Sequence, residues 1–105
     1  HLSLTAESRQ ASAEIINQEQ AKFNKPVLLA GDFNAKPETT EMLVFEKFWT
    51  RISPLQPTFP ADKPDRIIDY IFVSKNTTVE VPESCVVNEP MASDHRPIFA
   101  HVIFK

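Results

Sequence analysis

Polar residues that could carry out chemistry lie beside or within the apolar runs of this sequence. Asp32 and Asn34 follow one apolar run, Asp69 lies inside a second, and His95 stands shortly before a third. A carboxylate next to a carboxamide can activate a water molecule and hold a phosphoryl oxygen. An acid beside a histidine holds the imidazole in one tautomer and stabilises its charged form. These residues are therefore candidates for acid–base chemistry.

Each of these residues also has a purely structural interpretation. Asp32 and Asn34 can form a turn at the end of a strand, because such side chains hydrogen-bond their own backbone. If the chain instead stays extended there, their spacing of two places both side chains on the same side. Asp69 must be paired if its strand is buried, either with Arg66 or Arg96 for stability or with His95 for catalysis.

Composition limits the classes of protein that this chain can represent. A length of 105 residues allows one small domain, and the 42% of hydrophobic residues are typical of a globular chain. The net charge of −3 gives no overall attraction to nucleic acid or to an anionic membrane, although metal ions can supply positive charge locally. Cys85 is the only cysteine, which excludes an intrachain disulfide, and no stretch reaches the length of a transmembrane helix. The cellular compartment stays open.

Hydrophobic periodicity and proline content predict the elements that position these residues. We expect a helix over 3–23, a strand at 27–30 that is buried on both faces, and a second helix that runs from Thr39 or Thr40 to Trp49. After a proline-rich loop over 53–65 we expect strands over 66–73 and 98–104, with a weak strand near 79–81 or 86–87. Gly31 is the only glycine, so we expect it where only glycine fits.

Three motifs in a compatible order resemble the endonuclease/exonuclease/phosphatase superfamily. They are Gly31-Asp32-Phe33-Asn34, the run 66–73 and Ser93-Asp94-His95-Arg96-Pro97. The opening His1-Leu2 is similar to the end of the family's Thr-His-Leu strand. This superfamily includes deoxyribonuclease I, abasic-site exonucleases, inositol polyphosphate phosphatases and sphingomyelinases.

The resemblance implies a fold as well as an activity. The family fold is a four-layer αββα sandwich about twice this length, and residues 1–105 resemble its C-terminal half. The expected fold class is therefore α/β (α+β), with one mainly antiparallel mixed sheet and helices on one face. Such a half exposes an apolar sheet face, so the implied partners are the missing N-terminal half or a second copy in a homodimer.

The resemblance also implies a role for each site residue. The catalytic residues would be His1, Asp32, Asn34, Asp69 and His95, and the metal ligands Asp94, Asp32 and Asn34, with Mg²⁺ or alternatively Mn²⁺ bound. The implied activity is hydrolysis of a phosphoester in nucleic acid, inositol phosphate or a phospholipid head group. The alternatives are a non-catalytic interaction module that retains the fold, or a fragment that is inactive without its N-terminal half.

Overall fold

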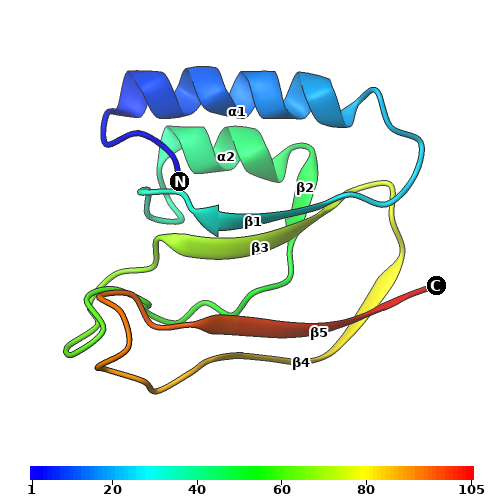
Figure 1. The fold of residues 1–105 in the computed structure, drawn as a ribbon. Coiled ribbons are helices and arrows are strands. Elements are labelled where there is room, and N and C mark those ends of the chain that lie inside the picture. The colour runs from blue at the N-terminus through cyan, green and yellow to red at the C-terminus, as the bar shows by residue number, and fades with distance from the viewer.

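The computed structural model describes all residues 1–105, which form two helices and five strands (Figure 1). The helices are α1 (Ala6–Gln20) and α2 (Thr40–Glu46). The strands are β1 (Leu28–Asp32), β2 (Trp49–Arg51), β3 (Asp69–Ser74), β4 (Val79–Val86) and β5 (Ile98–Phe104). Neither helix has the length and apolar character needed to cross a bilayer.

The strands form two antiparallel groups, a three-stranded sheet in the order β1-β3-β2 and a β4–β5 hairpin. In Figure 1 both helices lie on one side of β1 and β3, and the hairpin lies on the other side. The α+β fold class predicted from the sequence is confirmed. Two details differ from the expected single mixed sheet, since the hairpin forms a sheet of its own and no strand pair is parallel.

Aromatic side chains fill the core between the helices and the three-stranded sheet. Phe33 meets Phe45, Tyr70 and Phe72 edge to face, with ring centroids 5.0 to 5.4 Å apart. The Tyr70 hydroxyl donates a 2.7 Å hydrogen bond to the carbonyl of Ala35. This core therefore fixes both the end of β1 and the loop that follows it.

Polar contacts fix the two helices. The hydroxyl of Thr5 caps α1 by accepting a hydrogen bond from the Ser8 N–H, so this helix is three residues shorter at each end than the helix expected over 3–23. A buried ion pair between Arg9 and Glu41, 2.8 Å long, joins α1 to α2. Because both side chains are almost fully buried, this pair holds the helices in one relative position.

The expected strand buried on both faces is wrong for β1, and two further expectations need correction. Leu28 is 54% exposed and Ala30 is also exposed, because the helices cover only one face of this strand. The second helix ends at Glu46, and Trp49 belongs to β2, where antiparallel pairing with β3 overrides the helical spacing.

The two short segments expected to form a weak strand join into one long strand, β4. Its pairing register with β5 shifts between Glu80 and Glu83, around Pro82. Proline has no N–H for the ladder, which explains why the sequence pattern appeared interrupted there.

Candidate active site

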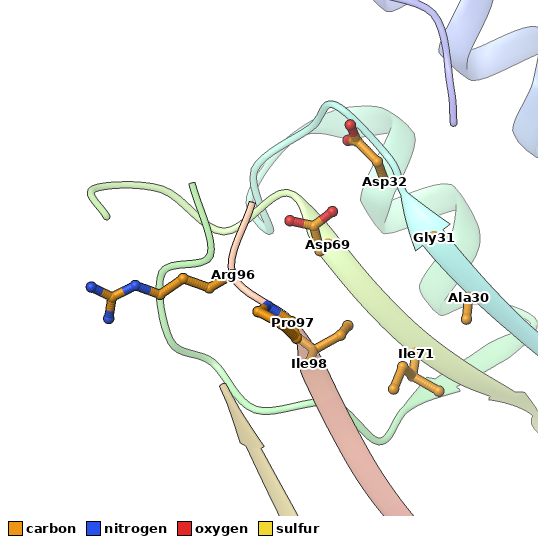
Figure 2. A pocket seen from close by; sticks show the side chains of 8 residues that line it. All are labelled: Ala30, Gly31, Asp32, Asp69, Ile71, Arg96, Pro97 and Ile98. Carbon is orange, nitrogen blue, oxygen red and sulfur yellow. The ribbon is translucent and has the colours of Figure 1, made fainter. Parts of the chain in front are cut away.

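Asp32 and Asp69 are direct cross-strand partners at the end of the β1–β3 pair. Residues that face each other in an antiparallel pair project to the same side, so both carboxylates reach the same region. Figure 2 shows the two side chains there, with Arg96 pointing away from both. Like charges placed opposite each other repel, so this arrangement needs a cation or a donor between them.

His95 supplies that group from the loop before β5. Its Nδ1 lies 2.9 Å and 3.1 Å from the two carboxylate oxygens of Asp69, and its Nε2 lies 3.5 Å from Oδ2 of Asp32. The Asp69 side chain is only 12% exposed and that of His95 26%. The imidazole is therefore held between two carboxylates in a partly buried position.

The electrostatic surroundings favour the charged form of His95. Burial by itself lowers the pKa of His95, but the hydrogen bond that His95 donates to Asp69 and the negative charges of Asp69, Asp32 and Asp94 outweigh it. The net pKa lies above the ordinary value of 6.5. His95 thus retains a proton at a higher pH than a free histidine does, which suits a group that stabilises negative charge.

The ion pairs of Asp69 with Arg66 or Arg96 that were considered as its structural interpretation do not form. Arg66 pairs instead with Asp65 at 3.0 Å, and the Nε of Arg96 donates to the carbonyl of Ala61 at 2.7 Å. Of the partners considered from the sequence, His95 is the one that contacts Asp69.

A segment of the proline-rich loop holds the backbone around His95. The N–H of Ala61 donates to the carbonyl of Asp94 at 2.8 Å, and the N–H of Arg96 donates to the carbonyl of Thr58 at 2.7 Å. The ring of Phe59 packs on the imidazole with centroids 4.8 Å apart. The contact of Phe59 with His95 was not predicted, because an aromatic residue between prolines gives no signal of a site.

Gly31 and Asn34 shape the backbone beside Asp32. Gly31 has a φ of +154°, and no heavy atom lies within 4 Å of where a Cβ would be. The backbone conformation at Gly31, and not a close approach of other atoms, therefore explains why only glycine fits at this position. Asn34 adopts a left-handed φ of 50°, so of the two alternatives considered from the sequence the extended chain does not form at this residue. Its N–H donates to Oδ1 of Asp32 at 2.8 Å, which is the turn considered as the structural interpretation.

The remaining predicted residues lie around this cluster. The Nδ2 of Asn34 donates a 2.6 Å hydrogen bond to the carbonyl of Leu2, and the N–H of Leu2 donates to the carbonyl of Asp32. His1 is exposed, and its side chain has no hydrogen bond or ion pair. Asp94 is exposed, and its carboxylate accepts a long hydrogen bond from Ser93.

Three of the predicted residues lie close enough to share a cation. One ligand atom each from Asp32, Asp69 and His95 lies within 4.8 Å of the others, and Asp94 is outside this group. The carboxylate oxygens suit a hard cation such as Mg²⁺, which keeps several water ligands and needs only one or two carboxylates. The surrounding carboxylates favour the protonated form of His95, and a histidine must be neutral to bind a metal, so the carboxylates fit a metal ion better than the imidazole does.

Two hollows adjoin the cluster. Asp32 and Asp69 line one of about 300 Å³ together with Ile71 of β3 (Figure 2). Asn34 and His95 line the other, of about 450 Å³. We name this second hollow the His95 pocket, and its lining consists of Leu4, Asn34, Lys36, Phe59, Arg66, Ile68, Asp94 and His95.

The family model described as endonuclease/exonuclease/phosphatase family matches residues 1–95. The chain belongs to this family. The resemblance seen in the three sequence motifs is thereby confirmed, and membership of the endonuclease/exonuclease/phosphatase family supports hydrolase chemistry in general. No curated protein sequence matches the chain significantly.

Several solved structures have the same fold as this chain. A functionally unknown conserved protein from Enterococcus faecalis V583 is 27% identical with a TM-score of 0.81, covering 100% of this chain and 48% of its own. A mannosyl-6-phosphatase from Bacteroides thetaiotaomicron is 22% identical with a TM-score of 0.80, covering 95% and 47%. A family protein from Bacteroides vulgatus is 22% identical with a TM-score of 0.74, covering 94% and 45%. The chain thus spans about half the length of these relatives, which fits a half-domain of the family fold.

Proposed function

We propose that this chain supplies the acid–base residues of a metal-dependent phosphoester hydrolase. The observation that carries the proposal is the position of His95, whose Nδ1 contacts Asp69 and whose Nε2 faces Asp32. A histidine fixed on one side by a carboxylate and free to act on the other is the arrangement that phosphoryl hydrolysis needs. Membership of the endonuclease/exonuclease/phosphatase family supports the same reaction class.

Each side chain has a distinct role in this proposal. Asp69 accepts a hydrogen bond from the Nδ1–H of His95 and so directs Nε2 outward. The charged imidazole stabilises negative charge that builds on the phosphoryl oxygens. Asp32 orients or deprotonates the attacking water, or protonates the leaving oxygen. Asn34 holds a phosphoryl oxygen through the amide hydrogen that its bond to Leu2 leaves free, and His1 contributes a second imidazole.

The proposed metal is Mg²⁺, with Mn²⁺ as an alternative. Asp32 would hold it through carboxylate oxygens, with Asp69 close enough to take part. Asn34 and Asp94 are the further oxygen ligands that the resemblance implies, although Asp94 is not in the group that Asp32 and Asp69 form. When bound, the cation neutralises charge on the phosphoryl oxygens and lowers the pKa of a coordinated water molecule. Further ligands would come from outside this chain, in keeping with its coverage of about half of each relative.

We also propose that the chain is the C-terminal half of the family domain. Leu28 and Phe99 support this, because these apolar side chains of β1 and β5 are 54% and 45% exposed. A complementary N-terminal half, or a second copy of the chain in a homodimer, would cover them. The isolated chain is then expected to hydrolyse substrate weakly or not at all.

The substrate class within this proposal includes nucleic acid, inositol phosphates and phospholipid head groups. The test is hydrolysis of bis-p-nitrophenyl phosphate and of plasmid DNA, with Mg²⁺ or with EDTA. The chain should be compared with a longer protein that adds a complementary half. We expect activity in the longer protein that EDTA abolishes. If neither substrate is cleaved under any condition, the non-catalytic interaction module becomes the better interpretation.

A further inference from the structure

Two cationic side chains, Lys36 and Arg66, line the His95 pocket, and the proposed hydrolysis gives neither of them a role. Lys36 has no ion pair, and it lies on the same pocket as Arg66 although the chain as a whole carries a net charge of −3. Asp94 is the carboxylate that lines this pocket. Asp32, Asp69 and Arg96 line the other hollow, so the lining of the His95 pocket is the more positive of the two, although Asp65 pairs with Arg66.

Arg66 is held in place by its surroundings. Its guanidinium carbon lies 5.0 Å from the centroid of the Phe59 ring, and its Nε donates to Asp65 at 3.0 Å. Neither Nη atom has a hydrogen-bond partner. Since Asp65 and Phe59 already restrain the guanidinium, binding an anion there loses less side-chain entropy than it would at a free arginine.

Phe59 also connects Arg66 to the proposed catalytic histidine. Its ring contacts the imidazole of His95 with centroids 4.8 Å apart, and the Arg66 guanidinium lies over the same ring. The backbone bridge between Phe59 and Arg66 holds this arrangement. Packing on Phe59, not a flexible loop, thus sets the position of Arg66 relative to His95, where the proposed function places the attacked phosphate.

The size of the pocket bears on what it binds. Its volume of about 450 Å³ falls within the range of about 300–1,000 Å³ typical of small-molecule sites. One phosphate group fills only a part of such a space. The apolar side chains of Leu4 and Ile68 line the remainder beside the two cations.

We infer that Lys36 and Arg66 form a subsite for a second anionic group of the substrate. This group is a phosphate or a carboxylate, and it belongs either to the leaving group or to the part of the substrate that keeps the attacked phosphate. This inference rests on the proposed function, because it takes the attacked phosphate to lie at His95. It narrows the substrate to a phosphoester that carries another anionic group within the span of one pocket. Arginine suits the role because its planar donors match phosphate and carboxylate oxygens.

The test measures binding without hydrolysis, using NMR titration of this chain with inorganic phosphate and with pyrophosphate. Pyrophosphate carries two linked anionic groups, and phosphate carries one. We expect pyrophosphate to bind more tightly, and Lys36→Gln and Arg66→Gln each to weaken its binding about fivefold, a value typical of exposed charges. Phosphate binding should change less than twofold. Lys25→Gln is the matched control, because it removes the same charge near the opposite end of β1.

Three outcomes overturn the inference. The first is an equal loss of phosphate and pyrophosphate binding, which would assign both cations to the attacked phosphate. The second is unchanged pyrophosphate binding in both pocket variants. The third is no preference for pyrophosphate in the unsubstituted chain. If instead hydrolysis is never found while the pyrophosphate preference depends on Lys36 and Arg66, the proposed function fails and the anion subsite stands.

Discussion

Asp32 and Asp69 face each other across the β1–β3 pair, and His95 lies between their carboxylates. Two negative charges at adjacent strand positions destabilise a sheet unless a positive charge separates them. The imidazole therefore has a structural role as well as the proposed catalytic one. Both roles depend on the protonation of a single side chain.

The first prediction concerns the pKa of His95. Asp69→Asn removes the main group that raises this pKa, so the pKa should fall, as measured by NMR titration of the ring protons. Asp62→Asn, a change of the same charge in the exposed part of the loop, should leave it unaltered. An unchanged His95 titration in Asp69→Asn would show that the pair does not control the imidazole.

The same shift gives a dependence of stability on pH. Because the folded pKa of His95 is raised, its contribution is complete below about 6.5, the value for the unfolded chain, and disappears as pH rises through the folded pKa. Urea unfolding of the unsubstituted chain should therefore show a loss of stability across this range. His95→Gln should remove that part of the pH dependence, and the persistence of the same loss would contradict the assignment.

A second pH effect is expected at the Arg9–Glu41 ion pair. Burial raises the pKa of Glu41, but hydrogen bonds from its own backbone N–H and from Arg9 outweigh burial, and the pKa lies below 4.5. The stabilisation by this ion pair is thus present above the ordinary pKa of a glutamate and is lost as pH falls through the lowered pKa of Glu41. Glu41→Gln should cost about 1–3 kcal/mol at neutral pH and less in acid. Glu14→Gln, an exposed change on α1, is the control, and equal losses at both sites would contradict the prediction.

Gly31→Ala tests the conformational reason for the single glycine. No atom blocks a Cβ there, so the cost should come only from the positive φ of +154°. We expect a loss of about 1–3 kcal/mol in the free energy of unfolding. Ala30→Ser, on the exposed neighbouring residue, should be nearly neutral in the same urea titration. A neutral Gly31→Ala would mean that the backbone at β1 adapts without strain.

Exposed apolar residues of the strands predict association of the isolated chain. Sedimentation velocity should show a sedimentation coefficient that rises with concentration, and Phe99→Lys should reduce this rise. Leu55→Lys alters a leucine of the proline-rich loop that is 59% exposed, compared with 45% for Phe99, and serves as the control. A monodisperse monomer at high concentration would argue against a need for a covering partner.

Much of the site could be predicted from the sequence, because a carboxylate inside an apolar strand needs a partner and His95 lies shortly before the C-terminal apolar run. The pairing of Asp69 with His95 matches the structure for that reason. The left-handed conformation of Asn34 could not be foreseen, since a local turn competes there with an extended strand. Trp49 was placed in the wrong element because its packing in β2 depends on β3, which follows much later in the chain.

The contacts of Phe59 were also beyond the sequence pattern. They depend on how residues 58–61 are held between Arg66 and the loop that carries His95. Such contacts between distant segments leave no periodic signal. The anion subsite inferred beside His95 follows from this packing and was not visible in the motifs alone.

The most direct test of the central claim compares His95→Ala with His101→Ala in a protein of family length that carries this chain. His101 is an exposed histidine of β5 away from the cluster, so it controls for the loss of an imidazole. Mg²⁺-dependent hydrolysis of bis-p-nitrophenyl phosphate should fall about 100-fold or more in His95→Ala and stay nearly unchanged in His101→Ala. Equal activity of the two variants, with both folded, would contradict the proposed role of the Asp69–His95 pair.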